Sequence, residues 1–277
     1  MLENVRKLVL PVGGLGKRLR PLTLRTPKAL VRLNDIPIVE YMLYEAAASG
    51  IREVILVVNP QHQPHFQKYI RNIRSKFPQL KFHLRRQEKP MGNGHAILQA
   101  ADVVGQEPFA VRFCDDIIPA EPPILASLLA LYRHYHAPIM LLERVPPRAV
   151  SRYGVVGVKP VTKPSYLPPG KVYRVNEFIE KPKLEQAPSN LIVIGGYIIT
   201  AHIMRNLTKI VNSLPVAGND ALPLAVAFQV ELIVGGKLYG WEFSGTRLDC
   251  GTIEALKMAE TMLAKNSPNR DDLPVGR

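Results

Sequence analysis

The segment RKLVLPVGGLGKRLRPLTLRTPKAL, residues 6–30, joins a short apolar run to a loop rich in glycine, proline and cations. The apolar run is typical of a buried strand, and the glycines and prolines after it mark a loop. Consecutive glycines let backbone N–H groups approach phosphate oxygens, and Lys17, Arg18, Arg20 and Lys28 add positive charge. The segment therefore predicts a strand that ends in a binding site for an anion.

The loop matches neither of two common phosphate-binding motifs. A Walker A loop would need a hydroxyl at Arg18 and its first glycine at Pro11. The dinucleotide-binding fingerprint would need a third glycine at Leu19. The shared physics of backbone N–H groups and cations still favours a polyphosphate ligand.

Outward from this loop, strand-like and helix-like segments alternate as far as residue 145. Alternation of apolar, β-branched strands with helices predicts an α/β protein whose mostly parallel central sheet is covered by helices on both faces. The expected strands are 6–12, 53–59, 81–87, 108–116 and 138–145, and the expected helices are 37–50, 61–77, 94–102 and 123–136.

The pattern changes after Pro146, where strand-like segments are broken by proline and glycine. Strands are expected at 153–160, 171–182 and 191–200, with only short helices between them, and a last helix at 251–265. We therefore divide the chain into a first half (1–145), a β-rich second half of the same compact domain (146–265), and a C-terminal tail (266–277).

Composition indicates a globular protein of the cytoplasm. The chain has 277 residues, of which 47% are hydrophobic and 21% charged, and its mean hydropathy is +0.01. No apolar run approaches the roughly 20 residues of a membrane span, and charges interrupt the N-terminus where a signal peptide would be apolar. The two cysteines, Cys114 and Cys250, suit a reducing compartment better than a disulfide framework.

The net charge of +13 raises the possibility of a nucleic-acid-binding protein. The cations are scattered, however, and no aromatic residues alternate with them as they do in RNA-binding signatures. We expect small polyanions rather than nucleic acid as partners, and no membrane. Steeply salt-dependent duplex binding would favour the alternative.

The loop closely resembles the signature of the sugar-1-phosphate nucleotidylyltransferases. Downstream segments narrow the resemblance to the bacterial UTP–glucose-1-phosphate uridylyltransferases, and the matches keep the family's order from about residue 6 to about residue 265. These segments are RRQEKPMGNGHAILQA, PFAVRFCDDII, YGVVGV, FIEKPKLEQAPSNLIVIGGYIIT and RLDCGTIEALKMAE. The resemblance implies a nucleotide-diphospho-sugar transferase fold, a Rossmann-like three-layer sandwich, and a homo-oligomer, either a dimer or a tetramer. It also implies that residues 1–145 are the nucleotide-binding half and residues 146–265 the sugar-phosphate-binding half of one compact catalytic domain.

The resemblance also implies a reaction, in which a sugar-1-phosphate oxygen attacks the α-phosphate of UTP and pyrophosphate leaves. Cations and Mg²⁺ suit this task, because two polyanions must be held in line. The implied catalytic residues are Arg18 and Lys28, and the implied metal ligands are Asp115 and Asp249. Nucleotide contacts are expected from Gly13, Gly14, Gly16, Lys17, Gln87, Gly92 and Asp116, and sugar-phosphate contacts from Gly154, Glu180, Lys181, Gly196 and Asn219.

The chain departs from the family pattern at two of these positions. Lys17 replaces the usual threonine of the glycine loop, and Asn219 stands where a glutamate usually accepts hydrogen bonds from glucose. An amide donates as well as accepts, so another hexose 1-phosphate is an alternative substrate. Two further alternatives are dTTP in place of UTP, and a homologue that binds nucleotide-sugar without turning it over.

Two cysteines adjoin the expected metal ligands, which raises the alternative of a thiolate metal site. Adjacent side chains of a strand point to opposite faces, so Cys114 and Cys250 should point away from a metal held by Asp115 and Asp249. We expect both cysteines to belong to the core.

Overall fold

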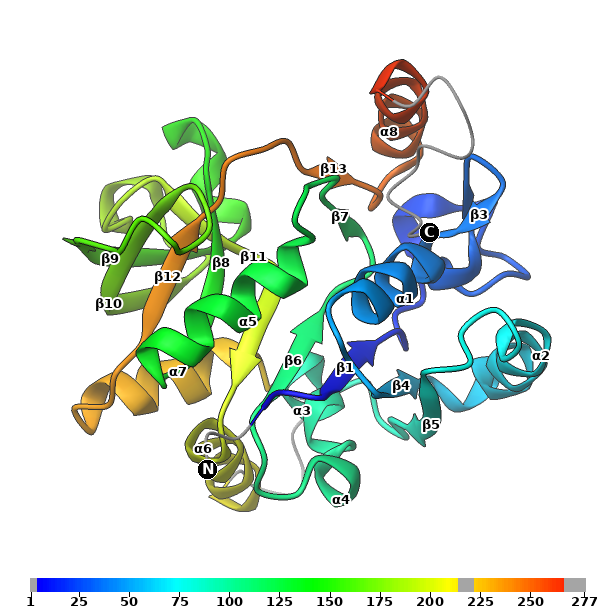
Figure 1. Cartoon of the computed structure of the whole chain (residues 1–277), viewed down its shortest axis with the longest axis horizontal. Helices are drawn as coiled ribbons and strands as arrows, with labels where there is room; N and C mark the ends of the chain where they lie inside the picture. Colours follow the sequence, from blue (N-terminus) through cyan, green and yellow to red (C-terminus); the bar gives the residue numbers. More distant parts are fainter. Residues whose placement is uncertain (1–3, 214–221, 267–277) are drawn as a thin grey trace.

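A computed structural model of the chain describes residues 4–213 and 222–266. Nine strands form one sheet in the order β5-β4-β1-β6-β11-β8-β12-β10-β9 (Figure 1). They are β1 (Lys7–Pro11), β4 (Glu53–Val58), β5 (Lys81–Arg86), β6 (Phe109–Arg112), β8 (Ile139–Arg144), β9 (Gly154–Val161), β10 (Lys171–Glu180), β11 (Leu191–Ile199) and β12 (Tyr239–Glu242).

Two short ribbons and a set of helices complete the described chain. One ribbon pairs β2 (Arg32–Leu33) with β3 (Ile36–Pro37), and the other pairs β7 (Asp116–Ile117) with β13 (Leu248–Asp249). The α-helices are α1 (Ile38–Ala48), α2 (Gln63–Ile73), α3 (Gly92–Leu98), α4 (Ala101–Val104), α5 (Ile124–Tyr135), α6 (Ala201–Ser213), α7 (Leu224–Ile233) and α8 (Ile253–Asn266). The 3-10 turns are η1 (Lys17–Leu19), η2 (Lys28–Leu30), η3 (Pro60–His62), η4 (Pro147–Arg152) and η5 (Leu184–Gln186).

The expectation of a mostly parallel sheet is wrong, because the sheet is mixed. Strands β5, β4, β1 and β6 run parallel to one another. Strand β11 is antiparallel to both β6 and β8, and β10 is antiparallel to both β9 and β12. A parallel pair needs a long crossover, usually a helix, whereas β9, β10 and β11 follow one another through short connections. The β-rich second half therefore joins the sheet mainly through antiparallel pairs, and β12, which runs parallel to β8, is the exception.

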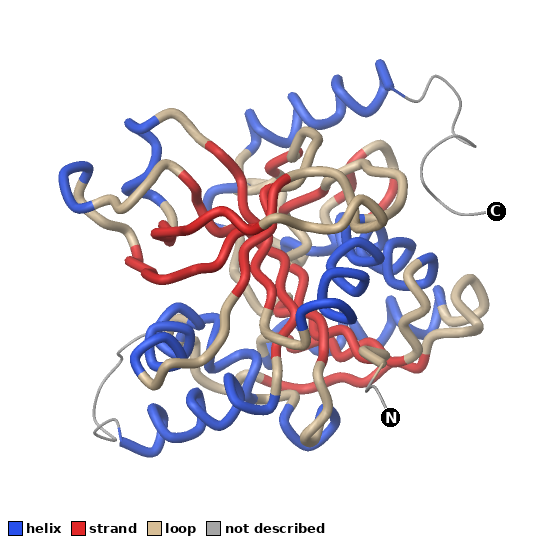
Figure 2. The backbone as a smooth tube through the Cα atoms, turned by 60° about the vertical axis from the view of Figure 1, so that its left-hand side comes forward, coloured by secondary structure: helices blue, strands red, loops and turns tan. Residues whose placement is uncertain are grey.

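Side chains alternate along the strands into two cores, one on each face of the sheet. In β1, Leu8 and Leu10 pack with residues of α1, α2, α5 and α8, while Val9 packs with residues of α3, α6 and α7. Figure 2 shows helices on both sides of the strands. Strands β1, β4, β6 and β11 are almost entirely buried on both faces, which explains the continuous apolar runs of the sequence.

The helices α6 and α7, which lie between the strands of the second half, are longer than expected. Helix α6 has 13 residues, and Ile203, Met204 and Leu207 bury its apolar face. Leu207 follows Met204 by three residues and Ile203 by four, and this spacing is a helical signal. The glycine- and proline-rich surroundings concealed it. Strand β6, in contrast, stops at Arg112 and does not reach the expected end at residue 116.

One sheet runs through both expected halves of the chain. Strand β8, from the first half, lies between β11 and β12, which belong to the second. The division at residue 145 stays a prediction, and most of the expected tail lies outside the described residues. No helix within the described ranges is long and apolar enough to cross a membrane.

Candidate active site

The glycine loop leaves the sheet at the carboxyl end of β1. Gly16 has a φ of +60°, and a Cβ there would lie 2.9 Å from side-chain atoms of both Lys28 and Thr23. The Thr23 hydroxyl donates to the Gly16 carbonyl at 2.8 Å. Glycine at position 16 therefore allows both the left-handed backbone and the close approach of the Lys28 and Thr23 side chains, and the loop folds back on itself.

Lys28 extends from η2 to the Asp115 carboxylate. Its Nζ lies 2.5 Å from Asp115 Oδ2, and only 16% of the lysine side chain is exposed. Burial by itself would lower the pKa of Lys28, but the Asp115 carboxylate more than offsets it, so the pKa is raised. Lys28 is therefore a fixed positive charge beside an expected metal ligand.

The ribbon of β7 and β13 places the backbone segments that carry the two expected metal ligands, Asp115 and Asp249, side by side. Asp116 and Asp249 are directly paired across it, and the Cys250 N–H donates to the Asp115 carbonyl at 2.9 Å. The Arg18 guanidinium also approaches this ribbon, because a Cβ on Gly251 would lie 3.1 Å from Arg18 Nη2. Residues about 90 to 230 positions apart in the chain thus meet at the carboxyl end of the sheet.

The expected metal ligands are hard carboxylate donors, which suit Mg²⁺. Asp249 accepts a hydrogen bond from the Gly251 N–H at 2.7 Å, which orients its carboxylate. No group of three or more acidic, histidine or cysteine side chains suited to a metal occurs among the described residues. Two carboxylates fit a Mg²⁺ that takes its remaining ligands from substrate phosphates and water.

Both cysteines belong to the core, as predicted. Cys114 and Cys250 are free and buried. Burial raises the pKa of Cys114 to about 12, so its thiol stays protonated at neutral pH. This protonation state is unlike that of a metal-bound thiolate.

Asp116, expected to contact the nucleotide, is held from two sides. The Arg247 Nη1 group donates to Asp116 Oδ1 at 2.8 Å, and the Gly195 N–H donates to Asp116 Oδ2 at 2.8 Å. Arg247 also donates to Glu143 at 2.6 Å and lies 3.7 Å from Asp249 Oδ2. Burial would lower the pKa of Arg247, but Asp116 and Glu143 raise it well above its usual range.

A cavity of about 200 Å³ opens beside this cluster. Gly154 and Glu180, both expected at the sugar site, line it together with Asp116 and Arg247. Burial raises the pKa of Glu180, and Lys181 opposes this effect. Aromatic rings of Phe178, Tyr197 and Phe228 stack beneath the cavity. The cavity therefore combines an apolar floor with carboxylate acceptors, as a sugar-binding site requires.

Gly196, expected at the sugar site, does not line this cavity, because successive residues of β11 face opposite sides. Its contact with the sugar phosphate stays a prediction. A Cβ on Gly195 would meet Phe113 at 2.6 Å and Asp116 at 2.7 Å, whereas one on Gly196 would meet Leu141 in the core. Asn219 lies outside the described residues.

Lys181 extends from the end of β10 into solvent. Its side chain is 65% exposed, and its Nζ lies 4.0 Å from Glu180 Oε1. The residue has a φ of +49°, and its N–H donates to the Tyr153 carbonyl at 3.0 Å. Lys181 is thus adjacent to the cavity wall with its charge free to meet an anion.

Gln87, expected at the base, stands at the carboxyl end of β5. Its amide nitrogen donates to the Gly92 carbonyl at 2.9 Å and lies 3.1 Å from His95 Nδ1. A Cβ on Gly92 would meet the Leu222 carbonyl oxygen at 2.8 Å, so that glycine accommodates the neighbouring chain. Asn93 fastens the same segment by accepting from the Leu224 N–H at 2.8 Å.

A buried ion pair that the sequence analysis missed supports the cavity wall. Arg112 is fully buried, and its guanidinium donates to Glu45 at 3.1 and 3.3 Å, to the Gly195 carbonyl at 2.8 Å and to the Asp116 carbonyl at 3.0 Å. Glu45 also accepts from the Leu125 N–H at 2.8 Å. The pair thus links α1 and α5 to both backbone segments of the cavity wall.

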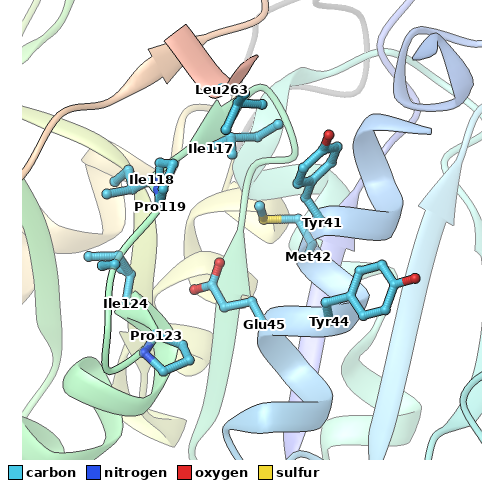
Figure 3. Close-up of a pocket in the computed structure, with 11 residues that line it drawn as sticks. Tyr41, Met42, Tyr44, Glu45, Ile117, Ile118, Pro119, Pro123, Ile124 and Leu263 are labelled. Carbon is cyan, nitrogen blue, oxygen red and sulfur yellow. The ribbon is translucent and has the colours of Figure 1, made fainter. Parts of the chain in front are cut away.

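Glu45 borders a second, mainly apolar cavity of about 40 Å³. This cavity lies between α1, the segment 117–124 and Leu263 of α8, and Figure 3 shows the Glu45 side chain directed from α1 toward Ile124. The apolar surroundings strengthen the attraction between Glu45 and Arg112. A charged residue within the apolar run of β6 was the signal available in the sequence, as was Arg247 two positions before Asp249.

Comparison with known proteins agrees with this geometry. A family described as nucleotidyl transferase matches residues 7–266. The UTP–glucose-1-phosphate uridylyltransferase YngB of Bacillus subtilis is 35% identical over 79% of this chain and 77% of its own. A second B. subtilis protein of that name is 32% identical over 90% of this chain and 88% of its own. A solved UDP-glucose pyrophosphorylase in complex with UDP-glucose superposes with a TM-score of 0.80 at 30% identity, over 95% of this chain and 99% of that one.

Proposed function

Because the chain belongs to the nucleotidyl transferase family, we propose that it converts UTP and glucose 1-phosphate to UDP-glucose and pyrophosphate. One observation carries this proposal. The β7–β13 ribbon pairs Asp116 with Asp249, and the Cys250 N–H donates to the Asp115 carbonyl beside it, at the point where Lys28 and Arg18 of the glycine loop approach. Carboxylates for a metal and cations for phosphates thus share one end of the sheet, beside a cavity suited to a sugar.

The reaction forms one bond and breaks one. A phosphate oxygen of glucose 1-phosphate bonds to the α-phosphorus of UTP, and the bond from that phosphorus to the bridging oxygen of the β-phosphate breaks, so that pyrophosphate leaves with its electron pair. Arg18 and Lys28 bind the triphosphate and stabilise the charge that builds up on the leaving group. Mg²⁺, when bound by Asp115 and Asp249, supplies further positive charge to the phosphates.

Gln87 contributes to the choice of base. Its amide nitrogen is occupied by the Gly92 carbonyl, while its carbonyl oxygen has no partner among the described residues. That oxygen can accept from the N3–H group of uracil. Thymine carries the same group, so dTTP remains an alternative nucleotide.

The sugar phosphate occupies the cavity of about 200 Å³. Glu180 accepts hydrogen bonds from sugar hydroxyls, the absence of a side chain at Gly154 leaves space for the ring, and Lys181 binds the phosphate. Another hexose 1-phosphate remains the alternative substrate, since Asn219 replaces the glutamate usual in glucose enzymes. A Rossmann-like nucleotide-diphospho-sugar transferase fold, a cytoplasmic location and a homo-oligomer are part of the same proposal.

Pyrophosphate release tests the proposal. The purified protein with Mg²⁺ is assayed with UTP, dTTP, ATP, CTP and GTP against the 1-phosphates of glucose, galactose, mannose and N-acetylglucosamine. The highest rate is expected for UTP with glucose 1-phosphate, and Asp115→Asn should lower it at least about hundredfold. Asp102→Asn is the matched control, because its exposed carboxylate pairs with Arg85 away from the site.

Other outcomes have distinct meanings. A maximum with another sugar or with dTTP would correct the substrate but keep the chemistry. If Asp115→Asn and Asp102→Asn lowered the rate of pyrophosphate release equally, Asp115 would not be part of the active site. If no substrate pair gave pyrophosphate release although UDP-glucose still bound, the enzymatic function would be contradicted. The protein would then be one that binds nucleotide-sugar without turning it over.

A further inference from the structure

A polar cavity of about 320 Å³ lies at the end of the sheet opposite the glycine loop. Its walls come from the chain before β1, the turn between α1 and β4, and the C-terminal half of α5. The five residues of β1, each rising about 3.3 Å, separate this cavity from the glycine loop by roughly 16 Å. It is therefore distinct from the proposed active site.

Three arginines line the cavity, namely Arg6, Arg52 and Arg133. The backbone fixes the first two side by side, because the Arg6 carbonyl accepts from the N–H groups of Arg52 and Glu53 at 2.8 and 3.1 Å. None of the three guanidinium groups has an ion pair or hydrogen bond within the described part of the chain, and no acidic residue of that part lines the cavity. Like charges gathered in this way lack a counter-charge.

Ser49 provides a second, independent observation. Ser49 lines the same cavity. Its hydroxyl is buried from solvent and has no hydrogen-bond partner among the described residues. Neighbouring groups do not need it, because the last carbonyls of α1 already accept from the N–H groups of Ser49, Gly50 and Ile51. A buried hydroxyl without a partner costs free energy unless a ligand or water satisfies it.

We propose that this cavity binds a small anion that bears a phosphate group. Guanidinium groups match phosphate oxygens in pairs, and three of them complement a phosphate dianion. Rotation of the Ser49 side chain about its Cα–Cβ bond would add its hydroxyl as a further donor. The volume suits a phosphorylated metabolite rather than a nucleic acid strand. This site also accounts for part of the excess of cations in the sequence, and it does not depend on the proposed function.

Calorimetric titration with inorganic phosphate at constant ionic strength tests the site. The variant Arg6→Gln/Arg52→Gln should weaken or abolish one class of phosphate binding, by about tenfold for each charge-assisted hydrogen bond lost. The matched control is Arg71→Gln/Arg74→Gln, which removes two exposed charges from α2 and its C-terminus and should bind phosphate like the unmodified protein.

Ser49→Ala gives a milder test that spares the charges. The hydroxyl has no partner to lose in the described structure, so stability should be unchanged while phosphate binds roughly two- to tenfold more weakly. A parallel titration with glycerol 3-phosphate distinguishes the source of the phosphate: tighter binding than inorganic phosphate indicates an organic phosphate, and equal binding indicates the free ion.

Three results would overturn the proposal. Phosphate binding that is the same in the unmodified protein and in Arg6→Gln/Arg52→Gln would place all of the binding elsewhere. Equal weakening in Arg71→Gln/Arg74→Gln would show an effect of net charge only. Duplex RNA or DNA binding that is lost in Arg6→Gln/Arg52→Gln, without phosphate binding in the unmodified protein, would identify a nucleic-acid surface instead.

Discussion

Substitutions in the buried Arg112–Glu45 pair should affect the stability of this protein and the geometry of its sugar cavity to different extents. Arg112 is fully buried and Glu45 is 10% exposed, so replacement of Arg112 by methionine leaves a carboxylate without a counter-charge in a largely apolar environment. Removal of one partner from a buried ion pair costs about 3–5 kcal/mol. We expect Arg112→Met to lower the free energy of unfolding by that amount.

The double variant Glu45→Met/Arg112→Met should recover more than half of this loss. It removes the unpaired charge, and a pair of apolar side chains of similar volume often replaces a buried ion pair without penalty. What remains is the Leu125 N–H, which loses its acceptor, at a cost of about 1–3 kcal/mol. The Gly195 carbonyl is less affected, since it also accepts from the Phe113 N–H at 2.9 Å.

Activity should not recover together with stability. In the double variant the Gly195 and Asp116 carbonyls lose the guanidinium that joins them, and both residues line the sugar cavity. We expect KM for the sugar 1-phosphate to rise about tenfold or more, with a smaller change for UTP. Arg112→Lys keeps the charge but lacks the planar fork, so it should retain more stability than Arg112→Met and still show the raised KM.

Equilibrium unfolding in urea, together with steady-state kinetics for both substrates, measures these effects. The control is Arg85→Met, which breaks the more exposed Arg85–Asp102 pair and should cost no more than about 1 kcal/mol. Our reasoning would be refuted if Arg112→Met were as mild as this control, or if the double variant regained full stability and unmodified KM values together.

Two further predictions concern the cavity wall. Gly195→Ala places a Cβ 2.6 Å from Phe113 and 2.7 Å from Asp116 and should raise KM for the sugar 1-phosphate; a KM equal to that of the unmodified protein would contradict this. Partial burial raises the pKa of Glu180, and its ionised form accepts hydrogen bonds from sugar hydroxyls on both oxygens and more strongly than its protonated form. The acid limb of kcat/KM should therefore lie at higher pH than for an exposed glutamate, and Glu180→Gln should remove this limb; an unchanged pH profile would exclude Glu180 from sugar binding.

Local patterns in the sequence were sufficient for most of the parallel half of the fold. Apolar runs between turn residues located β1, β4 and β8 to within two residues, because these strands are largely buried on both faces. Strand directions in the second half were not available from such patterns. They depend on which strands β11 pairs with, and the apolar sequence of β11 is compatible with parallel and antiparallel neighbours alike.

The same distinction applies within the site. Arg18, Lys28 and Asp115 stand in short motifs, so their residue types and spacing identify them. Arg112 and Arg247 act through contacts with residues 67 to 131 positions away in the sequence. Only the paths of β6 and β13 through the fold bring those partners within reach. The chemistry is thus encoded locally, whereas the parts that hold it in place depend on the sheet order, and substitutions at Arg112 and Arg247 test that order more directly than substitutions in the glycine loop.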